Sequence, residues 1–343
     1  MIPSPTVTIF MTAYNASRYI EEAIQSLVQQ TYTDFELLIV DDGSTDNTHE
    51  LILSFNDTRI RVIQNDKNEG LIYSRNIALA EAKGRYLAII DSDDIALPDR
   101  LELQVNEFKR RDSLALLGTP AYHIDQHSKR TKKILEVPSG ADIVACKLLF
   151  YNTFVHSSVM MKTSIFRSIG GYRNYRFAQD YDLMIRISHG YEVDNLQTPL
   201  VEYRTHDSNI SSMHSSEQAS YLQSIKFAQL DELEIPQKAE YVRMLLHHPS
   251  STVYNIPDYQ SFIILLINKN KDLGVYPENT FEKILFDLWY EVLLYKGKRH
   301  AIIQLFDVPM FFIKNIELKQ LRRILKLSIK SFVRPKIEKN ENS

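Results

Sequence analysis

Three short acidic segments hold the side chains of this sequence that could do chemistry together. They are Asp41-Asp42-Gly43-Ser44, Asp91-Ser92-Asp93-Asp94 and Gln179-Asp180-Tyr181-Asp182. The first two follow directly on the hydrophobic runs 35–40 and 85–90. Carboxylates gathered in one place repel one another and do not stabilise a fold. They indicate instead a site where a divalent cation binds together with the hydroxyl groups of a sugar or nucleotide.

The elements that must position these segments alternate between strand and helix over the first 110 residues. Strands are predicted over 6–11, 35–40, 59–64 and 85–90, followed in turn by helices over 17–29, 46–55, 71–82 and 98–110. Four such pairs are typical of an α/β fold with a mostly parallel sheet flanked by helices. Because parallel strands end at a common edge, where open sheets bind ligands, we expect the first two acidic segments to meet there.

The pattern is less regular after residue 113. We expect short strands over 115–117, 158–161 and 200–204, and a helix over 180–188. The polar stretch 211–216 is suited to a linker. Beyond it the periodicity predicts a mainly helical region, with helices over 218–233, 239–247, 259–268, 281–296 and 313–332.

Composition excludes several classes of protein. With 343 residues and 44% hydrophobic content, the chain can build a sizeable core. Its single cysteine, Cys146, excludes an internal disulfide and a zinc site made of several cysteines. The first residues do not resemble a secretory signal, and no run approaches the roughly 20 apolar residues of a membrane-spanning helix. We therefore expect a cytoplasmic protein.

The charge of the chain is unevenly distributed. Residues 314–343 contain nine Lys or Arg and three Glu, a net charge of +6, so the preceding 313 residues carry the net −9 that gives −3 overall. Because a nucleic-acid-binding protein usually has a basic body, this acidic body argues against nucleic acid as a partner.

The basic tail is predicted to form an amphipathic helix. Its two faces are Leu318, Leu321, Ile324, Leu325, Ser328 and Phe332 on one side, and Lys319, Arg322, Arg323, Lys326 and Lys330 on the other. Two interpretations stay open. Residues 314–343 could bind an anionic membrane surface at the inner face of the cell membrane, or the helix could pack on the catalytic domain with its basic face in water.

The turn after the first predicted strand argues against an ordinary dinucleotide-binding fold. That turn, Thr12-Ala13-Tyr14-Asn15, lacks the glycines that let backbone amides approach a diphosphate. The sequence also lacks a phosphate loop of the Gly-x-x-x-x-Gly-Lys type. A bound diphosphate would need another source of positive charge. A cation held by Asp91 and Asp93 could supply it, because hard cations favour oxygen ligands.

With these residues the sequence resembles the family 2 glycosyltransferases, which have the GT-A fold. The resemblance covers about the first 210 residues and rests on motifs that occur in the family's order. They are Met11 to Asn15, Val40 to Asp46, Asn68-Glu69-Gly70 with Ser74-Arg75-Asn76, Ala82-Lys83-Gly84, Asp91 to Asp94 with Pro98 to Leu101, Gly170-Gly171-Tyr172, and Gln179 to Leu183. The resemblance implies a GT-A catalytic domain over residues 1–212, with a nucleotide-binding half at 1–112 and an acceptor-binding half at 113–212. A helical region over 217–343 follows it.

The resemblance also implies roles in binding the nucleotide. Thr12, Tyr14 and Asp42 would line the pocket for the base, with Tyr14 packing on it and Asp42 accepting a hydrogen bond from a ring N–H. Arg75 would lie near the base or the phosphates. The ordinary interpretations are an aromatic residue at a strand end for Tyr14, a turn residue for Asp42 and a solvated helix residue for Arg75.

The second acidic segment would hold the donor and the cofactor. By resemblance, Asp91 and Ser92 would contact the nucleotide sugar, and Asp91, Asp93 and His206 would be ligands of a Mn²⁺ or Mg²⁺ ion. A helix cap explains the aspartates less well, because one oxygen is enough for a cap. A lone histidine such as His206 could equally have an ordinary surface role.

The third acidic segment would supply the catalytic base. In the enzymes that this sequence resembles, a carboxylate takes the proton of the acceptor hydroxyl as that oxygen attacks the sugar and inverts its anomeric centre. Asp180 is at that position, and His156 would line the acceptor pocket. The family often has Glu before this aspartate, and Gln179 departs from that pattern.

We therefore expect a metal-dependent inverting glycosyltransferase of the hexosyltransferase type. It would move a sugar from a nucleotide-diphosphate donor, a UDP-sugar, to a hydroxyl of a saccharide or lipid-linked acceptor in the synthesis of cell-surface polysaccharide or glycolipid. The alternative is a catalytically silent GT-A scaffold that binds a partner. A thermal-shift comparison with UDP and Mn²⁺ separates the two, because only a nucleotide-binding enzyme would be stabilised.

Overall fold

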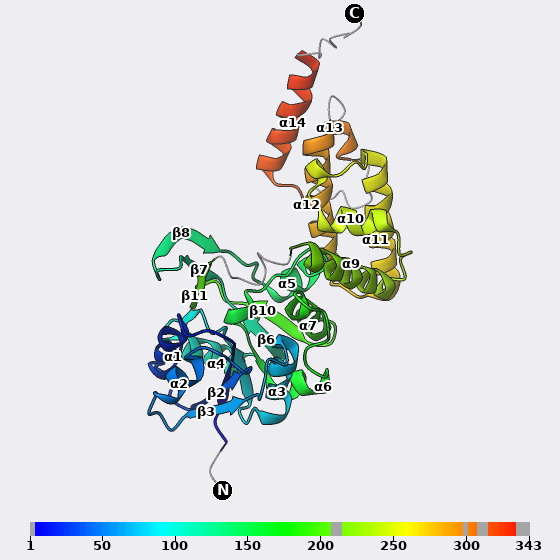
Figure 1. Cartoon of the computed structure of the whole chain (residues 1–343). Coiled ribbons are helices and arrows are strands. Elements are labelled where there is room, and N and C mark those ends of the chain that lie inside the picture. Colours follow the sequence, from blue (N-terminus) through cyan, green and yellow to red (C-terminus); the bar gives the residue numbers. More distant parts are fainter. Residues whose placement is uncertain (1–3, 207–214, 298–300, 307–314, 334–343) are drawn as a thin grey trace, which may run out of the picture. The chain divides into compact units, whose positions relative to one another are not determined.

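The computed structural model describes residues 4–206, 215–297, 301–306 and 315–333. The chain divides into two compact units (Figure 1). The first comprises residues 1–148 and 152–222, and the second comprises 149–151 and 223–343. This division falls at residues 222 and 223, inside helix α9 (Ser215–Glu232), whereas the sequence suggested a linker at 211–216. Most of that stretch lies outside the described residues.

A seven-stranded sheet forms the centre of the first unit. Its order is β10-β6-β9-β4-β1-β2-β3, and every neighbouring pair is parallel except those made by β9. The strands are β1 (Val7–Ala13), β2 (Phe35–Asp41), β3 (Ile60–Gln64), β4 (Tyr86–Ile89), β6 (Leu114–Gly118), β9 (Met160–Lys162) and β10 (Glu192–Asn195). The expected mostly parallel α/β sheet is therefore confirmed.

Hydrophobic periodicity explains why this sheet forms. Strand β2 is buried at every residue and β1 at all but one, as expected for parallel strands covered on both faces. Helix α1 (Ile20–Val28) buries Ile20, Ala23, Ile24 and Leu27 at helical spacing. The remaining helices of this unit are α2 (Thr48–Leu53), α3 (Leu71–Glu81), α4 (Arg100–Arg110), α5 (Ala141–Lys147), α6 (Thr163–Ser168) and α7 (Gln179–Ser188), with a 3₁₀ turn, η1 (His156–Ser158).

A second sheet lies in the same unit, and the sequence predicted only one of its strands. Its order is β5 (Ile95–Ala96), β11 (Val201–Arg204), β7 (Ala121–Ile124) and β8 (Arg130–Leu135). Strand β8 is an edge strand whose first five residues are exposed, so it has no buried face to produce a hydrophobic pattern. Strand β5 is only two residues long, too short for periodicity to detect.

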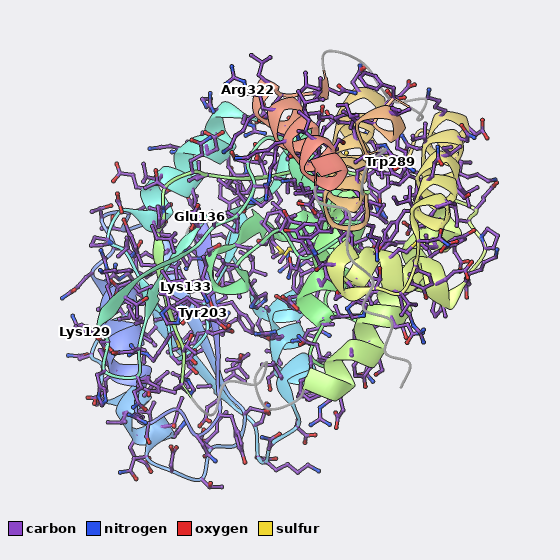
Figure 2. All side chains as sticks on the ribbon, turned by 90° about the horizontal axis from the view of Figure 1, so that it is seen from above. Lys129, Lys133, Glu136, Tyr203, Trp289 and Arg322 are labelled. Atoms are coloured by element: carbon purple, nitrogen blue, oxygen red, sulfur yellow. The ribbon has the colours of Figure 1, made fainter. Side chains whose placement is uncertain are left out.

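The second unit is helical, as predicted. After α9 it contains α10 (Ala239–Leu246), η2 (Pro249–Ser251), α11 (Ile256–Leu273), α12 (Glu278–Lys296), α13 (Ala301–Gln304) and α14 (Leu318–Val333). The side chains of Asn255 and Asp258 form a capping box that starts α11, and Gly274 ends it in the left-handed conformation. Trp289 on α12 is fully buried (Figure 2), which makes it a core residue of this unit.

Helix α14 does not bury its predicted apolar face as a single surface. Ile324 and Ser328 are buried, and the helix packs on α12 and α13 of the same unit. Leu318, Leu325 and Ile329 are exposed. The side chains of Lys330 and Phe332, and residues 314 and 334–343 altogether, lie outside what the structure describes. No helix within the described ranges has the length and apolar character needed to span a bilayer.

Candidate active site

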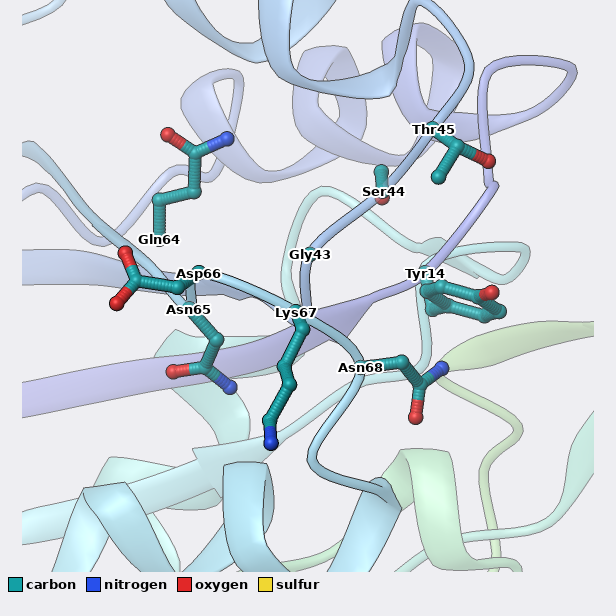
Figure 3. Close-up of a pocket in the computed structure, with 9 residues that line it drawn as sticks. All are labelled: Tyr14, Gly43, Ser44, Thr45, Gln64, Asn65, Asp66, Lys67 and Asn68. Carbon is teal, nitrogen blue, oxygen red and sulfur yellow. The ribbon is translucent and has the colours of Figure 1, made fainter.

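The carboxyl ends of β1, β2 and β3 meet at one edge of the large sheet and form a pocket of about 470 Å³ (Figure 3). It is lined by Tyr14, Gly43, Ser44, Thr45, Gln64, Asn65, Asp66, Lys67 and Asn68. Gly43 has a φ of +69°, and a Cβ atom there would lie 2.4 Å from the backbone of Lys67. This close approach requires glycine, because an L side chain would be strained and would also collide with the facing loop.

Asp42 fastens the loop that forms one wall of this pocket. Its Oδ1 atom accepts hydrogen bonds from Asn65 Nδ2 (2.7 Å) and the Glu69 N–H (3.0 Å), and its Oδ2 atom accepts one from the Gly70 N–H (3.0 Å). A carboxylate has about four acceptor positions, so one remains for a ligand N–H. The predicted bond from Asp42 to a base therefore stays a prediction, and the structure adds a role in shaping the pocket.

The other residues predicted for nucleotide binding lie at different places. Tyr14 lines the pocket and keeps 47% of its surface exposed, so its ring is accessible to a base. Thr12 is half-buried in β1 and does not line the pocket. Arg75 is buried on α3, where its guanidinium lies beside the second acidic segment.

Asp91 is the centre of a partly buried hydrogen-bond network. Its Oδ1 atom lies 2.8 Å from Arg75, and its Oδ2 atom accepts a hydrogen bond from the Ser157 hydroxyl (2.9 Å). His156 lies between Arg75 (3.3 Å) and the hydroxyl of Tyr172 (2.9 Å). The predicted donor residue Asp91 and the predicted acceptor residue His156 therefore belong to one network.

The electrostatics of this network favour the ionised forms of Asp91 and Arg75. Burial by itself raises the pKa of Asp91, but the Arg75 charge and the interactions with His156 and Ser157 together outweigh it and hold that pKa well below its ordinary value. Burial lowers the pKa of Arg75, but electrostatic interactions with Asp91, Tyr172 and Asp180 raise it above its ordinary value. Arg75 thus interacts electrostatically with one aspartate from the second acidic segment, Asp91, and one from the third, Asp180.

Asp93 and His206, two of the three predicted metal ligands, form a second pair. The Asp93 Oδ2 and His206 Nε2 atoms are 2.8 Å apart, and the ring of His206 packs on Tyr19. A carboxylate oxygen and an imidazole nitrogen fit a divalent cation such as Mn²⁺. Within the described parts of the chain, no third His, Cys, Asp or Glu joins them in a group of metal ligands. Asp91 is engaged by Arg75 and Ser157, so its role as a ligand stays a prediction.

The turn around Asp93 is held in place by hydrogen bonds from Arg204, a residue of strand β11. The Arg204 guanidinium donates to the Asp93 carbonyl (2.6 Å), and its backbone N–H donates to Asp94 Oδ1 (2.8 Å). Asp94 is buried, and burial together with the neighbouring Asp93 and Asp91 charges raises its pKa well above the ordinary value. Asp94 therefore positions the turn, while Ser92 is half-buried within it.

Asp180 is in the first turn of α7 and is half-buried. Its Oδ2 atom accepts a hydrogen bond from Asn152 Nδ2 (2.9 Å). Asp182, two residues later, is instead paired with Arg186 on the same helix (2.8 Å). Of the two carboxylates in this segment, only Asp180 belongs to the electrostatic group around Arg75 and Tyr172.

Several residues of the site were not assigned a role from the sequence. Tyr172 belongs to a recognised motif, but Asn152, Ser157 and Arg204 carry no local signal that marks them as site residues. Their partners lie 28, 66 and 111 positions away in the sequence. Only the folded chain brings them together.

Known proteins resemble this chain over most of its length. The family model described as "Glycosyl transferase family 2" matches residues 8–189. An uncharacterized glycosyltransferase of Haemophilus influenzae is 30% identical over 345 residues, 96% of this chain and 97% of that protein. The UDP-Glc:alpha-D-GlcNAc-diphosphoundecaprenol beta-1,3-glucosyltransferase WfgD of Escherichia coli is 40% identical over 112 residues, 33% of this chain and 44% of that protein.

A solved structure shows the same fold. The mannosyltransferase PcManGT from Pyrobaculum calidifontis, in complex with GDP-Man and Mn²⁺, has a TM-score of 0.52 at 16% sequence identity. The match covers 96% of this chain and 88% of that one. The GT-A fold expected from the sequence is therefore confirmed.

Proposed function

The chain belongs to glycosyl transferase family 2, and from this premise we propose that it is an inverting, metal-dependent transferase of the hexosyltransferase type. Its donor would be a UDP-sugar, and its acceptor a hydroxyl of a saccharide or a lipid-linked saccharide in the synthesis of cell-surface polysaccharide or glycolipid. WfgD, with a UDP-Glc donor and a diphosphoundecaprenol acceptor in its name, supports this choice of substrates.

One observation carries the proposal. Arg75 forms an ion pair with Asp91 and is also acted on by the charge of Asp180, which supports a single site for the segment proposed to bind the donor and the carboxylate proposed as base. An inverting transfer needs this closeness, because the acceptor oxygen must attack the donor sugar while its proton leaves to a carboxylate.

The base step follows from the position of Asp180. Its carboxylate takes the proton of the acceptor hydroxyl as the oxygen forms its bond to the anomeric carbon, and the bond from that carbon to the nucleotide diphosphate breaks. The carboxylate lies in the first turn of α7, where Asn152 Nδ2 donates a hydrogen bond to it. His156, which is hydrogen-bonded to the hydroxyl of Tyr172, would line the acceptor pocket.

The donor would be held by the residues at the sheet edge. Tyr14 would pack on the base in the pocket between β1 and β3, with Asp42 and Thr12 near it, and Asp91 and Ser92 would contact the sugar part of the nucleotide. Asp93 and His206 would hold a Mn²⁺ or Mg²⁺ ion. When bound, that ion would offset the negative charge that develops on the leaving diphosphate. PcManGT, whose structure contains Mn²⁺ with GDP-Man, supports such a cofactor.

A screen of nucleotide sugars for donor hydrolysis tests the proposal without an acceptor. We expect at least one UDP-sugar to be hydrolysed in the presence of Mn²⁺. Asp180→Asn should lower the rate at least about 100-fold while UDP binding persists, because the amide cannot take a proton. Hydrolysis at the wild-type rate by this variant would refute the role of Asp180. A protein that UDP with Mn²⁺ does not stabilise would be a silent scaffold instead.

We also propose that the protein works at the inner face of the cell membrane, bound through residues 314–343. The exposed side of α14 carries three aliphatic residues, Leu318, Leu325 and Ile329. Exposed Lys319, Arg322 and Lys326 lie among them (Figure 2 labels Arg322). The sequence of α14 has no acidic residue. Such a face complements an anionic lipid surface, where each cation contributes about 1 kcal/mol.

Flotation with lipid vesicles tests this surface. The full-length protein should bind vesicles that contain phosphatidylglycerol and should not bind pure phosphatidylcholine vesicles. Removing two charges, Arg322→Ala with Lys326→Ala, should weaken binding about tenfold or more. The matched control is Lys132→Ala with Lys133→Ala on the exposed strand β8, which changes the charge equally. Equal binding by both double variants would contradict the membrane role.

A further inference from the structure

We propose that Asn152 is the positioning residue of the catalytic base. Asn152 Nδ2 donates a hydrogen bond to Asp180 Oδ2 at 2.9 Å. The inference rests on the proposed function, because it gives a role in the reaction to a residue that contacts the base and not the substrate. The sequence did not indicate it, since Asn152 lies outside the recognised motifs and 28 positions before its partner.

The structure fixes which atom of Asn152 faces the base. Asn152 Oδ1 accepts a hydrogen bond from the backbone N–H of Phe154 (3.2 Å). If the amide were flipped, its NH₂ group would face that N–H and its oxygen would face the Asp180 carboxylate, and both contacts would be repulsive. Asn152 must therefore donate to Asp180.

The segment that carries Asn152 is itself held in place. The carbonyl of Thr153 accepts a hydrogen bond from Asn195 Nδ2 (3.0 Å), and the same Nδ2 atom donates to the carbonyl of Pro138 (2.9 Å). Asn195 ends strand β10 of the large sheet and is buried. The position of the Asn152 amide is thus set by the sheet rather than by a loop alone, which pre-organises its bond to the base.

This arrangement gives the two carboxylate oxygens of Asp180 different roles. Oδ2 receives the Asn152 hydrogen bond, and within the described part of the chain Oδ1 has no hydrogen-bond partner. Oδ1 is therefore the oxygen that would take the proton of the acceptor. Arg75 from α3 and Tyr172 also interact electrostatically with Asp180.

Replacing Asn152 by aspartate separates a positioning role from a purely structural one. The introduced side chain would have nearly the same shape and could still accept from the Phe154 N–H, but a carboxylate would face Asp180 at about the distance of the present bond. Two carboxylates so close share one proton, and the proton leaves only at higher pH. We expect Asn152→Asp to lower kcat at least about tenfold at pH 6 and to recover most of it by pH 9.

Two further variants complete the comparison. Asn152→Ala removes the donor without adding a charge, so kcat should fall about tenfold at every pH while KM for the donor stays within twofold. Asn195→Ala is the matched control, because it loosens the same segment without touching Asp180. Its loss of activity should not depend on pH.

The experiment measures kcat and KM for hydrolysis of the UDP-sugar found by the donor screen, from pH 5 to 9, and measures UDP binding to every variant by calorimetry. Recovery with pH in Asn152→Asp alone supports the proposal. The same pH profile for Asn152→Asp and Asn195→Ala, or wild-type kcat in Asn152→Ala, overturns it while the proposed function stands. A wild-type protein that binds UDP but hydrolyses no donor overturns the proposed function and this role with it.

Discussion

The ion pair between Arg75 and Asp91 allows a quantitative test of how the site is built. Only 8% of the Arg75 side chain and 31% of the Asp91 side chain are exposed, and their closest atoms are 2.8 Å apart. We choose Arg75→Met, because it removes the charge and keeps most of the buried volume. Asp91→Asn removes the other charge, and the double variant completes a thermodynamic cycle.

The expected magnitude follows from the geometry. At an effective dielectric constant of about 20, unit charges at this distance attract by about 6 kcal/mol, and the burial of Arg75 offsets part of that gain. Breaking a buried pair on one side costs about 3 to 5 kcal/mol. Because Asp91 keeps contact with water, we expect Arg75→Met to lower the free energy of unfolding by an amount at the lower end of this range. The cycle should give a coupling energy of about 2 kcal/mol between the two residues.

Urea unfolding measured by circular dichroism gives these free energies. Trp289, the single tryptophan, lies in the helical unit, so its fluorescence follows that unit and should be unchanged by the substitutions. The pKa of Asp91 is lower in the folded chain than its ordinary value of 3.8, so the pair stabilises the protein above that pH and loses its effect as the pH falls below it. A coupling energy below about 0.5 kcal/mol at pH 7, or one that grows at pH 3, would refute this account.

Three shorter predictions concern the pocket and the metal pair. Tyr14→Ala should weaken UDP binding about tenfold in calorimetry without changing stability, because the ring is exposed and would stack on the base. Gly43→Ala should destabilise the first unit by more than about 2 kcal/mol in urea, whereas Gly190→Ala, with open space around it, should stay within about 0.5 kcal/mol. His206→Ala and Asp93→Asn should each weaken Mn²⁺ binding about tenfold or more, measured by the effect of Mn²⁺ on thermal unfolding in the presence of UDP. Unchanged values in any of these would contradict the role given to that residue.

Much of the first unit could be predicted because its signals are local. The runs that became β1, β2 and β4 are buried strands, and each of the helices predicted between them exists. The acidic segments were found because they follow those runs. By contrast, β8 and β5 were not predicted, because neither an exposed edge strand nor a two-residue strand produces a hydrophobic periodicity in the sequence. The helical spacing of residues in α14 predicted a single apolar face. In the folded chain, however, Ile324 is buried, whereas Leu318 and Leu325 are exposed.

The sequence by itself determined the family, because its motifs resemble those of family 2 in their order. It also determined the parallel sheet and the edge at which the carboxylates gather, because hydrophobic periodicity and strand ends can be read from neighbouring residues. Only the tertiary structure decided the partner of each carboxylate. It pairs Asp91 with Arg75, Asp93 with His206 and Asp180 with Asn152. The last two pairs join residues 113 and 28 positions apart. Such bonds depend on how helices and strands pack against one another, and no local pattern records that packing.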